Sequence, residues 1–480
     1  MSAGTATAAS PRQEAKHDLD KQWLSKFVAE WAVNTRYEDL PREVRDAAVL
    51  FIADHVGVVL GGTAKESSRI MDRVARRWQP AEGTSTVIGF GRKTTPPLAA
   101  LVNGAAGHAL ELDDDHREGT QHPGVAIIPA ALAVAQDIGA SGKDLILAVA
   151  LGYEIMIRLG EAHLGKSYLC GFHPTGTCGS IGAAVSAGKL LGLSVEQMTG
   201  AIGLGASQSS GLSTFRSNGA WNKRLHPGHA AQAGILAAYL SKEDYRGPSE
   251  SLLSPEGWLQ AYAYKGEYSV DAITKTLGSK WELLDNSIKV HACCRFAAPI
   301  VDATLDAVNR YDIRPEQVES AQVGMAEFPL YRSLTEPRER KYHPTSVVDA
   351  QFSAPFAVAV SIIKRRAFVD EYSEEGIQDK DVLALAKKVT WYVDAEAERV
   401  WPTRYPAQVD IKMKDGRVLS ARIEWPKGDP ENAATPEELR TKFEALASGV
   451  IGPDRAQRAY AACQDLARLP DVRALGDLLA

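Results

Sequence analysis

The sequence has little cysteine: five residues in a chain of 480, with no CxxC pair. So few thiols exclude a disulfide framework, and the missing CxxC pattern excludes the common structural zinc modules. Cys293 and Cys294 are adjacent, which is not the spacing of a structural bridge. We therefore expect a protein of a reducing compartment, the cytoplasm.

Long apolar runs and a surplus of one charge are also missing. The most apolar early stretch, residues 47–61, contains Asp54 and His55, which would be costly in lipid. Residues 1–16 lack the apolar core of a secretory signal, and their small, polar side chains predict a floppy leader. With 54 basic and 60 acidic side chains the net charge is only −6, so we expect no nucleic-acid and no membrane partner.

Three common catalytic signatures are absent as well. The chain has no nucleophile elbow, no phosphate-binding loop of the P-loop type and no dinucleotide-binding fingerprint. The chemistry of the site must then come from Asp, His, Lys and Tyr side chains. Such groups bind carboxylates and move protons.

What the sequence does contain begins with a long helical region. From residue 17 to about residue 280, apolar side chains recur at helical spacing, for example at Trp23, Phe27 and Trp31. The tetrapeptide Ser194–Gln197 is a capping box and predicts a helix start. Many segments are rich in Ala and Gly, whose small side chains let helices approach closely. This region is therefore predicted to be a compact helical bundle.

The pattern changes near Trp281, where alternating and β-branched segments begin to mix with helices. The clearest piece has alternating apolar residues on both sides of Asp415–Gly416, which predicts a β-hairpin. After the Pro/Gly linker KGDPEN, Thr435–Glu438 is a capping box that starts a helical end. The predicted fold class is mainly α with a second α+β domain. Its parts are a leader (1–16), a helical domain (17–283), an α+β lid (284–428) and a C-terminal helical segment returning to the helical domain (429–480).

Four clusters could carry chemistry, and the first is HALELDDDHREGTQHPG, with His108, three consecutive acids at Asp113–Asp115, and His122. Neighbouring carboxylates repel, so this segment must be solvated, charge-compensated or metal-bound. A solvated loop is the plain interpretation. A metal site has suitable ligand types but no fixed ligand spacing such as HExxH.

The second cluster, GFHPTGTCGSIG, places His173 before a Gly-rich helix start, whose free N–H groups suit a carboxylate. Its glycines at 176, 179 and 182 indicate close helix packing, since no strand precedes them. The third, NKRLHPGH, could be a solvated face or a carboxylate grip before an Ala-rich helix. The fourth, SIKVHACCRF, lies where the two regions meet, and its cysteines suit burial better than catalysis.

At these four clusters the sequence resembles the MmgE/PrpD family, which includes 2-methylcitrate dehydratases, cis-aconitate decarboxylases and iminodisuccinate epimerase. Six segments carry the resemblance in order: LPREVRDAA…ADHVGVVLGG, HALELDDD…HPG, GFHPTGTCG, AWNKRLHPGHAAQAG, SIKVHACCRF and PTSVVDAQFSAPF. It extends over nearly the whole chain, from about Leu19 to about Leu469. The resemblance implies a helical domain with an α+β lid, a site between them, no metal or organic cofactor, and a homodimer.

The resemblance also implies roles for single residues. The expected catalytic residues are His122 and His173 as base and acid, Asp113 to orient a histidine or a lysine, Lys223 and Lys289 to bind a carboxylate and stabilise its charge, and Tyr168 near a proposed acid/base position. The expected substrate-binding residues are Glu111, Asp114, Arg224, His226 and Arg295. The chain departs from many relatives in three places. It has Glu111 where an Asp is usual, Ala298 where a His is frequent, and Phe356 where a Tyr is frequent.

These observations predict a cofactor-independent lyase that removes a proton next to a carboxylate of a small di- or tricarboxylic acid. A placed base and nearby cations are what such a weakly acidic proton requires. The first hypothesis is a 2-methylcitrate dehydratase-like enzyme. The alternatives are a cis-aconitate decarboxylase-like lyase or an iminodisuccinate-type epimerase. An alternative of another class, motivated by Ala298 and Phe356, is a non-catalytic polycarboxylate-binding protein.

Overall fold

The structure is a computed structural model and describes residues 11–79 and 82–480. Residues 1–10 of the predicted leader (residues 1–16) lie outside the described residues. From Pro11 the chain is already helical, so α1 (Pro11–Asn34) begins earlier than the predicted boundary at residue 17. Proline is tolerated in a first helical turn, and the next five residues, RQEAK, are good helix formers.

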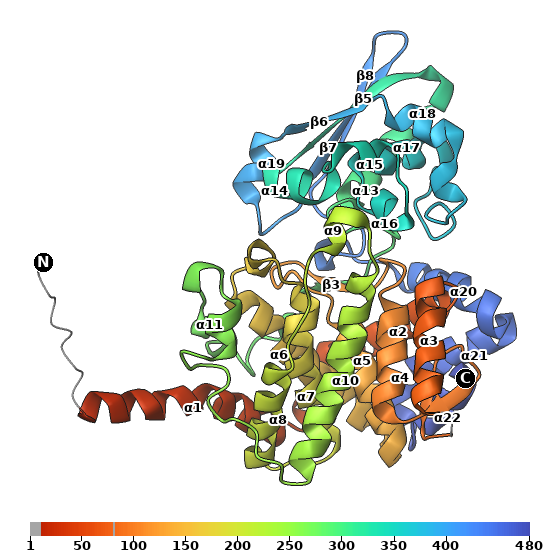
Figure 1. The fold of residues 1–480 in the computed structure, drawn as a ribbon. Coiled ribbons are helices and arrows are strands. Elements are labelled where there is room, and N and C mark those ends of the chain that lie inside the picture. The colour runs from red at the N-terminus through yellow and green to blue at the C-terminus, as the bar shows by residue number, and fades with distance from the viewer. Residues whose placement is uncertain (1–10, 80–81) are drawn as a thin grey trace, which may run out of the picture.

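The N-terminal part of the chain is a bundle of helices, drawn in red to green in Figure 1. After α1 its helices are α2 (Arg42–Gly62), α3 (Glu66–Trp78), α4 (Pro96–Gly107), α5 (Gly124–Ile138), α6 (Gly142–Ala162), α7 (Pro174–Leu190), α8 (Val195–Ser207), α9 (Phe215–Asn218), α10 (Asn222–Lys242), α11 (Trp258–Tyr262) and α12 (Val270–Thr274). A short hairpin of β1 (Ser85–Val87) and β2 (Arg92–Thr94) interrupts the predicted succession of helices. Its turn contains Gly89 and Gly91, both at positive φ, which glycine adopts without strain.

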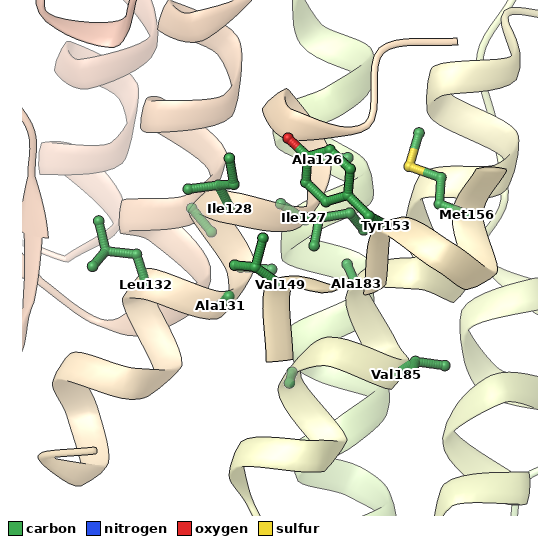
Figure 2. Close-up of a cluster of buried hydrophobic side chains, with 14 of the residues drawn as sticks. Ala126, Ile127, Ile128, Ala131, Leu132, Val149, Tyr153, Met156, Ala183 and Val185 are labelled. Atoms are coloured by element: carbon green, nitrogen blue, oxygen red, sulfur yellow. The ribbon is translucent and has the colours of Figure 1, made fainter. Parts of the chain in front are cut away.

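Small residues bring the helices of the bundle close together, as the sequence predicts. A side chain at Gly234 of α10 would meet Ala183 of α7 at 2.5 Å, and one at Gly182 would meet the backbone of Gly152 in α6 at 2.8 Å. The apolar cluster in Figure 2 fills the space between α5, α6 and α7 with branched side chains such as Ile127. The glycines at 176, 179 and 182 thus serve helix packing.

The predicted apolar stripe of α1 is not its buried face. Trp23 and Phe27 are 41% and 37% exposed, whereas Leu24 and Val28 are buried. The buried face continues through Ala29 and Ala32, whose small side chains let α1 lie closely on α8. The aromatic residues have helical spacing, but the face that packs on α8 is the neighbouring one, which carries the small side chains.

The second body of the structure is the α+β lid, in cyan to blue at the top of Figure 1. Its elements are α13 (Ala298–Arg310), β5 (Val318–Met325), α14 (Glu327–Pro329), α15 (Arg338–Tyr342), α16 (Val347–Gln351), α17 (Ala354–Lys364), α18 (Lys380–Ala386), β6 (Val389–Val393), α19 (Ala395–Val400), β7 (Ala407–Met413) and β8 (Val418–Ile423). The strand order is β6-β5-β7-β8, with β5 and β6 parallel and the other pairs antiparallel. The predicted hairpin joins β7 and β8, and Gly416 at its turn has φ +90°.

The last three helices lie beside the bundle (Figure 1), and the first of them also borders the lid, because its Leu446 belongs to the apolar cluster of the lid. They are α20 (Pro436–Ile451), α21 (Pro453–Gln464) and α22 (Arg473–Leu479). Thr435 and Glu438 form the predicted capping box at the start of α20. Phe443 of α20 packs on Gly57 of α2, where an added Cβ would meet its ring at 2.9 Å. The boundary residues proposed for the domains stay a prediction.

Two short strands join the bundle to the start of the lid. β3 (Asp115–His116) pairs antiparallel with β4 (Asn286–Ser287), so the first acidic cluster and the fourth cluster of the sequence are held side by side. Among the described residues no single helix is long and apolar enough to span a membrane. The helices α2 and α3 taken together have the required length and apolar character, but the chain bends by 91° where they meet.

Candidate active site

A pocket opens between the bundle and the lid, with about 600 Å³ of space when its mouth is included. We call its two sides the bundle wall and the lid wall. The bundle wall consists of Glu111, Asp115, His116, Arg117, Thr120, Gln121, His122, Tyr168, Phe215, Arg216 and Lys223, and the lid wall of Cys294, Arg295, Phe296, Phe328, Ser333, Phe352 and Tyr405.

The acids of the first cluster form what we call the acidic strap, residues 111–115, between α4 and α5. The interpretation of this segment as a solvated loop is wrong, because each of its four acids is at most 4% exposed. The same holds for the cations of the third cluster: Lys223 and Arg224 are 4% and 6% exposed and lie in the first turn of α10. Acids and cations are buried together, so each compensates the other.

Lys223 forms an ion pair with both carboxylate oxygens of Glu111. Burial raises the pKa of Glu111, but Lys223, His108 and Lys289 together outweigh it and lower this pKa to about 2. Lys289 approaches the strap from the lid side of the junction. Its ammonium donates to the Glu111 carbonyl at 3.0 Å and lies 3.8 Å from a carboxylate oxygen of Asp113.

Asp113 holds two histidines. One of its carboxylate oxygens lies 2.8 Å from Nδ1 of His108 and 3.1 Å from Nδ1 of His122. Nδ1 of His122 is also 2.9 Å from the carbonyl of Asp114. A carboxylate and a carbonyl only accept, so both Nδ1 atoms carry hydrogen, and in the neutral form of either ring the lone pair is on Nε2. Burial raises the pKa of Asp113, but His108 and Lys289 outweigh it, and Asp113 stays ionised.

His173 lies behind this pair, at the N-terminus of α7. Its Nδ1 is 3.0 Å from Nδ1 of His226, and its ring is 5.7 Å from that of His108. Burial lowers the pKa of His173 far below its usual range and that of His226 to about 4, so both rings are neutral near pH 7. One ring must therefore donate to the other. His173 is not among the residues that line the pocket.

Tyr168 lines the pocket beside Arg216, whose guanidinium stacks 5.1 Å from the centre of its ring. Burial raises the pKa of Tyr168, so its hydroxyl remains a hydrogen-bond donor. Cys294 on the opposite wall has its pKa raised to about 11 by burial, so its thiol is no nucleophile at neutral pH. Both cysteines of the fourth cluster are buried, as predicted.

The structure separates the predicted site residues into three groups. His122, Tyr168, Lys223, Glu111 and Arg295 line the pocket, whereas Asp113, His173, Lys289 and His226 lie behind them. Asp114 and Arg224 are engaged elsewhere. Asp114 accepts from the Gly124 N–H and the Tyr153 hydroxyl, at 3.0 and 2.8 Å, and Arg224 donates to the Ser67 hydroxyl at 3.0 Å.

The sequence interpretation missed several residues in or beside the pocket, and the clearest is Asp429, which lies behind the lining residues Arg117 and Arg295. It belongs to the supposed linker KGDPEN, yet it is fully buried and accepts from Arg295 at 2.5 Å and from Arg117 at 3.2 Å. Arg295 also pairs with Asp115 at 3.0 Å, and Arg117 with Glu431 at 3.1 Å. Proline and glycine around Asp429 indicate an exposed linker. The sequence signal for a buried acid partner is Arg117, a cation two residues after the acids of the first cluster.

Of the three positions that depart from many relatives, Glu111 lines the pocket, whereas Ala298 and Phe356 contribute no polar group to it. Ala298 is buried at the start of α13, and Phe356 is fully buried in α17, where its ring lies 5.5 Å from that of Tyr372. Neither side chain is among the pocket-lining residues.

Within residues 11–79 and 82–480, two groups of side chains have the ligand types of a metal site, with ligand atoms within 4.8 Å of one another. In the group of His116, Glu161 and Glu282, Nδ1 of His116 accepts from the Gly119 N–H at 3.0 Å. The proton of the neutral ring is then on Nε2, which leaves no lone pair for a metal beside the two carboxylates. In the group of His108, His122 and His173 the first two rings have free Nε2 lone pairs, so this group fits a metal in donor type.

Comparison with known proteins gives a consistent picture over both bodies of the structure. The MmgE/PrpD N-terminal domain matches residues 26–271, and the MmgE/PrpD C-terminal domain matches residues 291–467. The cis-aconitate decarboxylase of Aspergillus terreus is 28% identical over 96% of both chains. The cis-aconitate decarboxylase-like protein oryM of Aspergillus oryzae is 27% identical, over 94% of this chain and 96% of that protein. The cis-aconitate decarboxylase of Mus musculus is 27% identical, over 89% of this chain and 87% of that protein.

Proposed function

The chain belongs to the MmgE/PrpD family, and from this premise we propose that it is a cis-aconitate decarboxylase-like lyase. The relatives described above are decarboxylases, that is lyases, which agrees with the predicted enzyme class. They support the decarboxylase alternative better than the first hypothesis, a 2-methylcitrate dehydratase. A small carboxylate substrate agrees with the cations that the sequence clusters bring to the pocket.

Decarboxylation of cis-aconitate breaks the bond between its methylene carbon and the carboxylate on that carbon. The electron pair of this bond forms a new C=C bond with the central carbon. The pair of the old double bond moves to the alkene CH carbon, which takes up one proton, and CO₂ leaves. No oxidant or reductant is needed. The protein must hold the remaining carboxylates with cations and deliver one proton.

The observation that carries the proposal is His122 on the bundle wall, oriented by Asp113. With its Nδ1–H directed at Asp113, the ring exchanges protons through Nε2. Asp113 stays ionised and stabilises the imidazolium from which the proton is given. We assign proton delivery to His122 and a second donor role to Tyr168, whose hydroxyl lines the same wall.

Carboxylate binding falls to the cations of the pocket. Arg216 is the lining cation for which the structure shows no carboxylate partner among the described residues, so we assign it to one carboxylate of the substrate. Lys223 is held by Glu111 and Lys289 by the strap, so both place positive charge near His122 in fixed positions. Preorganised charge of this kind is effective because it needs no rearrangement during the reaction.

A substrate panel tests the proposal. The purified protein is incubated with cis-aconitate, citrate and 2-methylcitrate, and both CO₂ and the unsaturated products are measured. We expect CO₂ from cis-aconitate. Loss of water from citrate or 2-methylcitrate without CO₂ would return the assignment to the dehydratase. Binding by calorimetry without any turnover would favour the non-catalytic binding protein.

We also propose, from the family resemblance, that the protein works as a homodimer without a metal or organic cofactor. A reducing cytoplasmic location is proposed from the unpaired cysteines alone. Light scattering coupled to size-exclusion chromatography tests the dimer, because a mass near twice the 51.8 kDa of one chain is expected.

A further inference from the structure

The lid wall of the pocket carries a group of aromatic rings that no step of the proposed reaction uses. Phe296 and Phe328 line the pocket and are only half-buried. Their ring centres are 6.3 Å apart, edge to face. Trp401 lies behind them, at 5.6 Å from Phe296 and 5.4 Å from Phe328, and fixes both rings. The pair is thus a firm apolar surface that faces the space of the pocket.

This surface is unsuited to a carboxylate. The face of an aromatic ring carries negative charge density, so it attracts cations and hydrocarbon but not anions. Two arginines that also line the pocket, one on each wall, do not change that. Arg295 is paired with Asp115 and Asp429, and Arg117 is paired with Asp429 and Glu431.

The other aromatic rings of the pocket differ in this respect, including Tyr405, which contacts Phe296 and has Arg295 over its ring at 5.5 Å. Lys223 lies 5.5 Å from the ring centre of Phe352 and 6.0 Å from that of Phe215. Arg216 lies over Tyr168. These rings therefore face the cations that hold carboxylates. For Phe296 and Phe328 the structure shows ring–ring contacts but no cation over either ring among the described residues.

We propose that Phe296 and Phe328 form a subsite for a hydrocarbon group of the substrate, so that the preferred substrate is a polycarboxylate with an alkyl substituent. This inference rests on the proposed decarboxylation and names its substrate class. In cis-aconitate the alkene CH carbon can carry such a group in place of its hydrogen, which leaves the methylene carbon and its carboxylate, the site of bond cleavage, unchanged. The charged end then lies at the bundle wall and the alkyl group on the two rings.

The test compares cis-aconitate with analogues that carry a methyl, propyl or hexyl group on the alkene carbon. We expect kcat/KM to rise by up to about fourfold for each methylene that the rings cover. Phe296→Ala and Phe328→Ala should lower the ratio of kcat/KM for the propyl analogue to that for cis-aconitate by about tenfold. Phe296→Leu, which keeps apolar bulk, should retain most of this ratio. Tyr311→Ala removes an exposed ring of the lid and serves as the control, with the ratio unchanged.

The outcomes separate the inference from the function on which it rests. Turnover of cis-aconitate with no gain from any alkyl group would overturn the hydrocarbon subsite and leave the decarboxylase standing. Turnover that favours the analogues but does not respond to Phe296→Ala or Phe328→Ala would also overturn it. If no acid of the series releases CO₂, the proposed function fails. Calorimetric affinities of the same acids then decide whether the rings bind the alkyl group.

Discussion

The two walls of the pocket are built from different materials. The bundle wall and the residues behind it bring together acids, lysines and histidines at helix ends and on the acidic strap, each tied to a buried partner. The lid wall presents aromatic rings and a guanidinium that is already neutralised by Asp115 and Asp429. Charge placed on a rigid bundle can act on a reacting group, whereas rings on a separate domain can select the shape of the substrate. We infer that chemistry resides in the bundle and selectivity in the lid.

The largest effect should come from the histidine of the bundle wall. His122→Gln removes the proton carrier but keeps a polar side chain of similar reach. We expect turnover to fall about 100- to 10,000-fold, the usual contribution of a placed acid or base. The exposed His343 of the lid gives a matched control in His343→Gln, which should turn over normally. Near-normal kcat in a folded His122→Gln protein would place the chemistry outside the bundle wall.

The next effect concerns stability and activity together. Lys223→Met leaves the buried carboxylate of Glu111 without its partner, which should lower the free energy of unfolding by about 3–5 kcal/mol. The double variant Lys223→Met/Glu111→Gln removes both charges and should recover most of that loss. Turnover should stay low in both proteins, because the cation is gone. Urea unfolding and kcat/KM measure the two responses, and a double variant with restored turnover would show that Lys223 only balances Glu111.

A smaller effect is the pH dependence of the free energy of unfolding, which should change with a histidine behind the bundle wall but not with a ring of the lid wall. Burial lowers the pKa of His108 and of His226 to about 4, while unfolded histidine titrates near 6.5. Between these values the unfolded chain binds more protons than the folded one, so the free energy of unfolding should fall as pH drops from 6.5 to 4. His226→Asn should flatten this dependence by up to about 1.4 kcal/mol per pH unit. Phe296→Leu, on the lid wall, should leave the slope as it is; an unchanged slope in His226→Asn would mean that this ring is charged in the fold.

The smallest expected effect is none at all. Dialysis against EDTA should leave turnover unchanged. The three histidines that could bind a metal, His108, His122 and His173, are assigned to proton transfer and to packing around the proton donor. Their donor atoms fit a metal in type, so the experiment carries weight. Lost activity that returns with zinc, magnesium or iron would make the bundle wall a metal centre.

Much of the fold could be predicted from local patterns. The capping boxes at Ser194 and Thr435 and the Asp415–Gly416 hairpin depend on neighbouring residues, and all three are found in the structure. The buried face of α1 could not be predicted from spacing, because two adjacent faces were both apolar and the partner helix decided between them.

The predicted site residues that line the pocket lie mostly on the bundle wall, and on the lid wall Arg295 alone was predicted. His122, Lys223 and Glu111 lie in polar motifs that interrupt apolar segments, which marks them in a sequence. Asp429 sits in a stretch with the composition of a linker, and its burial depends on Arg117 and Arg295, which are more than a hundred residues away in the chain. Phe296 and Phe328 resemble ordinary core residues until the structure places them at a pocket.

The central claim is that the bundle wall delivers one proton as CO₂ leaves, and turnover of cis-aconitate in heavy water tests it most directly. Product is collected after partial conversion and examined by NMR and mass spectrometry. The account predicts one deuterium for each CO₂ released, on the carbon that was the alkene CH and on one face only, with the His122→Gln protein far slower. CO₂ release with deuterium on both faces alike, or with none at that carbon, would contradict delivery from a fixed group on the bundle wall.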